Sequence, residues 1–522
     1  MRRIADPKAI YVLTVTIAGR VFRFAEQDVE IEGVPYRGGL AVEGLSESLS
    51  FLVPDTPNDD ATVSGLVFPV DLAAMEVGGA WMESGTAELS RWSPETLLSE
   101  RSVVVRGRIA NPAYGLEGEP ASLAITPDGI DELTLFPPTS AKVDADTYPD
   151  APSGSRGLRY PFPIGKPGLP TDYPDGRRGA VPGIALDIAA AETTVLISGA
   201  PVAATAVRMF RDDDLALPGE NCPVTLARDG RGRTVAVATW PHGSASTGGP
   251  GPGPGPPGAG ENVVVDGAIF RVDWSTSLGG ILGNDGQPLG PMGRVTEYML
   301  SQSSVDWDAG AWASARDVLD SYRVDGYLDE PAPPWETALA AWLWLAPVSV
   351  RAGENGLLPI AWRIEPAPPA LMAFVVDENC ERVDEFETDG AERANAFSFA
   401  HSADREDEYA VTDTLDSATS HPCATSESHH GRIDSAESME SRMVYDTPTA
   451  FKAMSWRSIA YAHPRWVRRI MSSRPEARER LVGDYVTLTD SLGGADSLGA
   501  YVVDIVRSLE TVTLTLAIIH RP

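Results

Sequence analysis

The sequence has little of several residue types, and each shortage excludes a class of protein. Cysteine occurs three times in 522 residues, at Cys222, Cys380 and Cys423, so neither a disulfide framework nor a CxxC-based site is expected. Lysine occurs four times, and acidic residues outnumber basic ones to give a formal net charge of −32. A surface that coats DNA or RNA needs clustered basic side chains, so that class is excluded.

Long apolar runs are also missing. No run of about 18 apolar residues occurs, and residues 1–10 lack the apolar core of a secretory signal. We therefore expect no membrane-spanning segment and a chain that is made in a cytoplasm. What the sequence does contain is 43% hydrophobic residues, 49 glycines and 43 prolines, which favour a globular protein with many turns and short strands.

Residues 1–145 are expected to form an N-terminal β-barrel-like domain. Short apolar runs with partial alternation follow one another closely from residue 10, and the run at 102–109 should pair with the run at 122–126. Strands this short and frequent favour a closed or nearly closed antiparallel barrel, because closure removes exposed edges. A generic β-sandwich is the alternative.

Residues 146–247 begin with a Pro/Gly-rich crossing segment and continue as a second β domain, with a hairpin turn at Asp229-Gly230. Within the crossing segment, Gly165 to Gly168 lacks the GxxxxGK[ST] spacing of a phosphate cradle, so a structural turn is expected. Residues 248–262 include GGPGPGPGPPGAG, which has no side chains to bury. They form a linker, or a long loop that reaches a neighbouring subunit.

Residues 263–370 contain a small helical segment. Helical spacing predicts one helix from Val295, a second from Trp312 capped by Asp306 or Asp308, and a buried third over Trp335 to Leu345. Asn355-Gly356 then predicts a hairpin. The segment is rich in tryptophan, which at helical spacing is core or interface more often than an exposed sugar platform: Trp307, Trp312, Trp335, Trp342, Trp344 and Trp362.

Residues 371–522 are expected to form a second barrel-like domain with one helix. Between residues 377 and 430 the polarity rises, and we expect strands with long polar loops, such as Asn395 to His401. A helix over 447–459 and three closing strands at 483–489, 499–506 and 512–519 follow.

No residue set is assigned to catalysis, and no metal or cofactor site is assigned. His421, Cys423, His429 and His430 are the one cluster of soft ligands, but their spacing matches no standard zinc site. A cysteine nucleophile at Cys423 or Cys380 lacks a surrounding signature, and carboxylates near Cys380 would raise the pKa of its thiol. The acidic runs at 212–214 and 404–408 are typical of solvated loops rather than glycosidase pairs.

Several stretches nevertheless resemble a known family. These are VDGYLDEP at 324–331, GENGLLPIAWR at 353–363, Ser428 to Arg432, Tyr445 to Ala450, and the closing strands. Their order resembles that of the baseplate-hub (tail-tip hub) proteins of tailed bacteriophages. His430 stands where an aromatic residue is usual, and Ile433 replaces a second arginine. The resemblance covers most of the chain, and its motifs are structural rather than catalytic.

The resemblance implies a β-rich α+β multidomain fold with two tube-like antiparallel β-barrel domains, a second β unit and a small helical segment. It implies a structural, non-enzymatic virion protein that assembles in the host cytoplasm as a homotrimer. The ring would join the sixfold tail tube and distal tail proteins to a central spike or fibre protein, with a tape-measure protein as a further partner. DNA would pass through its acidic lumen without specific binding. A tail-associated peptidoglycan hydrolase is the alternative.

Overall fold

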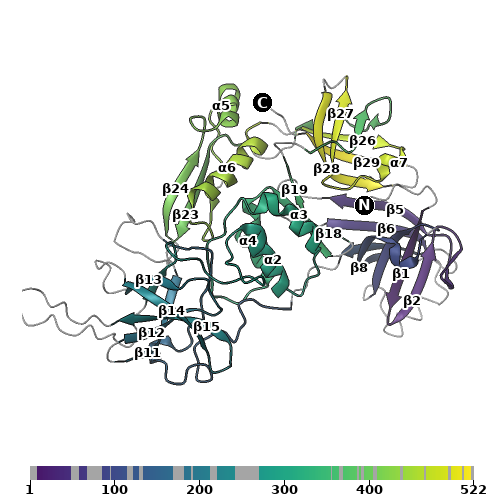
Figure 1. Ribbon diagram of the computed structural model, residues 1–522. Helices are drawn as coiled ribbons and strands as arrows, with labels where there is room; N and C mark the ends of the chain where they lie inside the picture. The colour runs from purple at the N-terminus through teal and green to yellow at the C-terminus, as the bar shows by residue number, and fades with distance from the viewer. Residues whose placement is uncertain are drawn as a thin grey trace, which may run out of the picture.

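The computed structural model describes residues 9–48, 58–66, 85–94, 96–113, 121–127, 133–168, 181–189, 192–211, 220–241, 270–353, 356–363, 368–384, 387–388, 393–403, 408–435, 439–463, 466–491, 495–507 and 511–518. Across these residues the protein is a β-rich α+β structure with a small helical segment, which confirms the predicted fold class. The helices of residues 292–341 occupy the centre, a closed barrel lies on one side, strands from both chain ends lie together on the other, and the helices and strands of residues 397–461 lie above the closed barrel (Figure 1). None of the helices in these ranges is both long and apolar enough to cross a bilayer.

The largest sheet has 14 strands and is built from both ends of the chain. Its N-terminal part runs in the order β2-β1-β7-β8-β9-β6-β5, and the predicted pairing of β8 with β9 is confirmed. Alternating residues such as Leu13, Val15 and Ile17 point into a core of its own. The strands are β1 (Ile10–Ile17), β2 (Arg20–Ala25), β5 (Ala41–Ser48), β6 (Asn58–Leu66), β7 (Thr86–Trp92), β8 (Ser102–Ala113) and β9 (Ala121–Pro127), with the separate hairpin β3 (Val29–Ile31) and β4 (Val34–Tyr36) beside them.

The C-terminal part of the same sheet continues as β28-β29-β26-β21, with β27, β20 and β22 attached. It has a second, separate core that includes Phe374, Ile470 and Leu514. The alternating closing strands predicted from the sequence are therefore present. They are β20 (Ala373–Val375), β21 (Glu381–Arg382), β22 (Glu387–Thr388), β26 (Trp466–Ser472), β27 (Tyr485–Asp490), β28 (Ala495–Arg507) and β29 (Val512–Ile518), together with the short helix α7 (Pro475–Arg478).

A closed six-stranded barrel forms a third β unit, in the order β11-β12-β15-β14-β13-β16. The ring closes because Val272 of β16 pairs with Val181 of β11 on one side and with Met209 of β13 on the other. Strand β16 follows the Gly/Pro-rich stretch 248–262, which lies outside the described residues. The strands are β11 (Val181–Ile188), β12 (Glu192–Ser198), β13 (Ala206–Arg211), β14 (Glu220–Arg228), β15 (Thr234–Pro241) and β16 (Phe270–Asp273).

The position of the closed barrel differs from the expected one. The sequence placed barrel-like domains at 1–145 and 371–522, and both of these units are half-barrels of one continuous sheet. The second β unit closes instead. A half-barrel has a free strand edge. Here β5 and β28 pair with each other, so neither strand pairs with a strand that would close its own half-barrel.

The helical segment lies between the closed barrel and the half-barrels and shares a core with the former. Helix α3 begins where Asp308 accepts a hydrogen bond from the Ala311 amide, which confirms one of the two predicted caps. The third helix is shorter than predicted, because it ends at Ala341 and continues as a 3₁₀ turn. The elements are α2 (Met292–Gln302), α3 (Ala309–Leu319), α4 (Pro334–Ala341), η5 (Leu343–Leu345) and the central hairpin of β18 (Val348–Gly353) and β19 (Gly356–Ala361).

The polar stretch after residue 393 is more regular than predicted. Residues 395–401 are not a loop, because β23 (Phe397–Ala403) pairs with β24 (Tyr409–Leu415) and β25 (Met439–Glu440). Residues 421–430 are not a polar loop either, because they form a helix, α5 (His421–His430). The side-chain amide of buried Asn395 contacts Gly431 and Ile433 and holds the end of this helix in place. The predicted helix at 447–459 is present as α6 (Thr447–Tyr461).

Candidate functional site

Residues 45–48 of β5 pair with residues 504–507 of β28, and we call this pairing the seam. The strands are antiparallel, with Ser48 opposite Asp504 and Leu45 opposite Arg507. Arg507 is buried at the end of β28, where it donates to the carbonyl oxygens of Arg478 and Arg480. The seam therefore joins two half-barrels with separate cores into one sheet (Figure 1).

A buried ion cluster holds the C-terminal half-barrel together. The Asp490 carboxylate is 1% exposed and receives Arg468 at 2.6 Å and Arg382 at 2.5 Å. These residues lie on β27, β26 and β21, so one carboxylate connects three strands. Because ions buried this deeply have lost their hydration, each depends on its partner.

Tyr501 attaches the central hairpin to the C-terminal half-barrel. Its hydroxyl donates to the Arg363 carbonyl at 2.6 Å and accepts from the Arg363 amide at 3.0 Å. Its ring packs edge-on against Trp362, with the centroids 5.0 Å apart. The helical segment and the half-barrel are therefore joined by both polar and aromatic contacts.

Most tryptophans of residues 263–370 are core residues, whereas Trp307 and Trp344 are half-buried. Five tryptophan side chains are less than 2% exposed, and three of them donate indole hydrogen bonds within the chain. Such side chains are unavailable for stacking on a sugar or for contact with another subunit. The five are Trp274, Trp312, Trp335, Trp342 and Trp362.

Helix α6 is anchored to this core through Arg457. The guanidinium lies 4.3 Å from the Trp456 ring centroid and 5.1 Å from that of Trp344, and it donates to the Trp344 carbonyl. Burial lowers the pKa of Arg457 to about 10, so the side chain keeps its charge at neutral pH. Cation–π contacts of this kind gain strength when water is excluded.

The Gly-rich turn of the crossing segment has a structural role. Gly165 has a φ of 64°, and the amide that follows it, on Lys166, donates to the Asp325 carboxylate at 2.6 Å. Burial raises the pKa of Asp325, while Arg323 opposes this effect. Because a side-chain carboxylate already occupies the amide, the turn does not serve as a phosphate cradle, as the sequence indicated.

The motifs behind the sequence resemblance are explained by local structure. Asp325 belongs to VDGYLDEP, whose Gly326 begins β17 (Gly326–Leu328) opposite β10 (Phe162–Ile164). Gly431 ends α5 with a φ of 74°, and the Asp446 carboxylate accepts the Thr449 amide to begin α6. These residues direct the chain and contain no reactive set.

The cysteine and histidine cluster does not converge. His421, His429 and His430 are exposed on α5, whereas Cys423 is fully buried on its inner face. Burial raises the pKa of the Cys423 thiol. No group of three or more metal-ligating side chains occurs within the described ranges. Burial also raises the pKa of Cys380 to about 11, with Asp490 and Asp377 contributing in the predicted direction.

One hydrogen-bonded set of Ser, His and Asp has no motif in the sequence that would have identified it. His401 contacts the Asp413 carboxylate at 2.9 Å and the Ser402 hydroxyl at 3.0 Å. The Ser402 side chain is buried, so no substrate carbonyl reaches its oxygen. The acidic runs at 212–214 and 404–407 lie outside the described residues.

Comparisons with known proteins give structural matches only. No protein-family model matches the sequence, and no curated protein matches it. Among solved structures, the 43 kDa tail protein of prophage MuSo2 from Shewanella oneidensis is 9% identical, with 97% of this chain and 98% of that chain covered and a TM-score of 0.39. A tail protein from Neisseria meningitidis MC58 is 10% identical, with coverages of 97% and 96% and a TM-score of 0.38.

A topological model of the p2 virion baseplate in its activated conformation is 9% identical, with 98% of this chain and 100% of that chain covered and a TM-score of 0.22. These three solved structures are phage tail and baseplate proteins.

Proposed function

We propose that this protein is a structural component of a phage tail, a baseplate hub whose three copies form a ring between the tail tube and a central spike or fibre. It acts by shape and assembly rather than by catalysis. The observation that carries the proposal is the seam, because it makes one chain present two half-barrels on a single sheet.

The stoichiometry follows from that arrangement. Three copies in a closed ring would present six half-barrels, alternating between N-terminal and C-terminal units. A threefold ring would then offer six related β surfaces to a sixfold tube, while keeping threefold symmetry toward a trimeric partner. The link at Tyr501 supports this role, since it holds the C-terminal half-barrel against the central hairpin, and the seam attaches the N-terminal half-barrel to the same sheet.

The charge of the chain supports passage of DNA through such a ring. With a net charge of −32 and four lysines, the wall of a lumen would repel phosphates on average rather than bind them. DNA would pass without being held by base or backbone contacts. Tail tube, distal tail and tape-measure proteins are the partners that this position implies, and the virion tail tip is the location.

The test is the oligomeric state of the full-length protein, alone and mixed with its tube protein. Light scattering after size exclusion should give a trimer, and negative-stain images should show a ring with a central hole. Zymograms on peptidoglycan should show no clearing. A protein that stays monomeric in both preparations, or one that clears cell walls, contradicts the proposal.

A further inference from the structure

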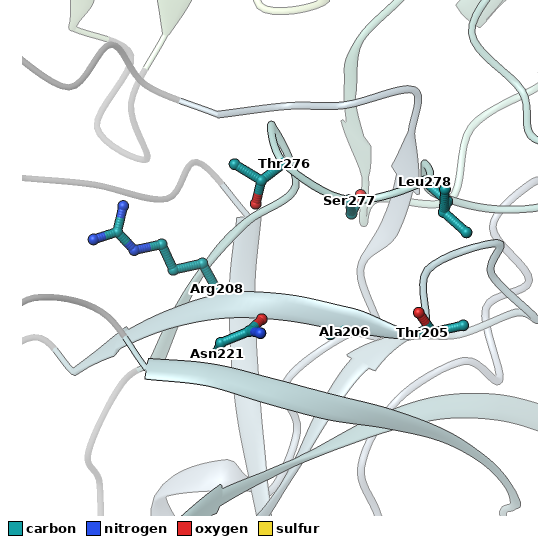
Figure 2. A pocket seen from close by; sticks show the side chains of 7 residues that line it. All are labelled: Thr205, Ala206, Arg208, Asn221, Thr276, Ser277 and Leu278. Atoms are coloured by element: carbon teal, nitrogen blue, oxygen red, sulfur yellow. The ribbon is translucent and has the colours of Figure 1, made fainter.

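An open cavity of about 360 Å³ lies beside the closed barrel. Strand β13 and the residue before it form one wall, Asn221 of β14 lies next to it, and the loop after β16 faces both (Figure 2). This volume is within the range of small-molecule sites, which is roughly 300–1,000 Å³. The lining residues are Thr205, Ala206, Arg208, Asn221, Thr276, Ser277 and Leu278.

Four of the polar side chains that line this cavity are open to a ligand. In the part of the chain that the structure describes, Thr205, Arg208, Asn221 and Thr276 make no side-chain hydrogen bond and no ion pair. Arg208 has one aromatic contact, with its guanidinium carbon 5.2 Å from the centroid of the Phe210 ring. Thr205, Asn221 and Thr276 are exposed and Arg208 is half-buried, so polar side chains from three chain segments border one open space and are accessible to a ligand.

The loop wall of the cavity is held in place from behind. The Ser277 hydroxyl donates to the Trp274 carbonyl at 2.8 Å and accepts the Gly279 amide at 3.1 Å. Trp274 is fully buried, and its amide donates to the Pro167 carbonyl. A wall fixed in this way is preorganised, so a ligand would not have to order it.

The side chains define the chemistry of a ligand. A guanidinium only donates and matches the paired oxygens of a carboxylate or phosphate. Threonine hydroxyls and an asparagine amide both donate and accept, which suits the hydroxyls of a sugar. None of the described residues that line the cavity is a carboxylate, and Leu278, 64% exposed, adds an apolar surface at its rim.

We propose that this cavity binds one anionic sugar unit, a hexuronic acid or a phosphorylated hexose. Arg208 holds the charged group, and Asn221, Thr205 and Thr276 bind ring hydroxyls. The proposal does not depend on the tail-assembly role, because it rests on the barrel wall and not on the seam.

Calorimetric titration of the full-length protein at low salt tests the ligand class. The probes are methyl glucuronide, glucose 6-phosphate, uncharged methyl glucoside and inorganic phosphate. We expect saturable binding of at least one anionic sugar, with the glucoside and inorganic phosphate at least about tenfold weaker. The stronger of the two anionic sugars identifies the charged group. No saturation by either sugar at about 10 mM, or equal binding of inorganic phosphate, overturns the proposal.

Three variants test the residues. Arg208→Gln should weaken binding at least about tenfold, and Asn221→Asp should abolish it, because a carboxylate then faces the anion. Arg228→Gln is the matched control, since Arg228 is exposed on the same strand, β14, and lies outside the cavity. It should leave the affinity within about twofold. Unchanged binding by Arg208→Gln, or an equal loss in Arg228→Gln, contradicts the assignment, and thermal melts confirm that each variant is folded.

Discussion

Replacing Asp490 by asparagine should strongly destabilise the C-terminal half-barrel. The Asp490 carboxylate is 1% exposed, and its partner Arg468 is 2% exposed at a distance of 2.6 Å. Asparagine keeps the shape of the side chain but removes its charge, so the buried guanidinium loses its counter-ion. Removal of one partner from a buried ion pair costs about 3–5 kcal/mol.

The loss is measurable as a shift in the unfolding of one unit. For a unit of roughly 150–250 residues, each kcal/mol lowers the Tm by about 2–4 °C, so the transition should move down by about 6–20 °C. Differential scanning calorimetry gives the shift, and hydrogen exchange at the amides of β26 and β29 assigns it to this half-barrel. Asp317→Asn is the control, because the Asp317–Arg363 pair is 54% and 44% exposed and should contribute at most about 1 kcal/mol.

A double variant separates the charge effect from a packing effect. Arg468→Met combined with Asp490→Asn should recover part of the stability lost by Asp490→Asn alone, because no uncompensated charge stays buried. The reasoning is refuted if Asp490→Asn shifts the Tm no more than Asp317→Asn does. It is also refuted if the double variant loses the full sum of the two single changes.

Four further predictions follow from the described contacts. Gly165→Ala should lower the free energy of unfolding by more than about 3 kcal/mol, because a Cβ there would lie 2.0 Å from a carboxylate oxygen. Gly19→Ala, at a φ of 77° in open space, should lower it by about 1 kcal/mol. Equal losses in urea titrations would refute the steric argument. Tyr501→Phe removes two hydrogen bonds and should cost about 1–2 kcal/mol, with faster amide exchange directly after β19, and unchanged exchange there would assign the link to the rings alone. The raised pKa of Asp325 means that the free energy of unfolding of the wild-type protein falls as pH rises above about 4 toward the raised value. Asp325→Asn should reduce this pH dependence in unfolding titrations. An unchanged pH dependence would exclude Asp325 as its source. Cys423, fully buried with a raised pKa, should react with an aromatic disulfide reagent only after unfolding. Rapid reaction of the native protein would make Cys423 a candidate nucleophile again.

Local signals in the sequence were sufficient for much of the fold. Asp308 precedes an apolar stripe with helical spacing and caps α3, and the closing strands alternate clearly enough to be placed within a few residues. Asp229-Gly230 lies in the turn between β14 and β15. These features depend on neighbours within a few positions, which is the range over which periodicity and turn chemistry act.

Features that depend on distant partners were not predictable in this way. A strand pattern does not say which strand lies beside it, so nothing in residues 45–48 identifies 504–507 as the neighbour, and nothing marks β16 as the strand that closes the barrel. The polar run containing α5 looked like a loop because its stability comes from tertiary contacts. Asn395, far away in sequence, binds the end of that helix and offsets its weak amphipathic pattern.

The candidate sites show the same division. The sequence correctly favoured a structural turn at Gly165, since the spacing of a phosphate cradle is missing. The cavity at Arg208 and Asn221 was not predictable from the sequence, because those residues lie beside the loop after β16 only once the barrel has closed. Single polar residues on separate strands carry no motif.

The seam has a consequence for synthesis of the protein. A ribosome must make residues 49–503 after β5 before β28 can pair with it, so the N-terminal half-barrel leaves the ribosome with one strand edge uncovered. Prematurely terminated chains keep that edge exposed and are candidates for aggregation or degradation. Only a chain that extends through β28 presents both half-barrels, which would keep shorter products out of the proposed ring.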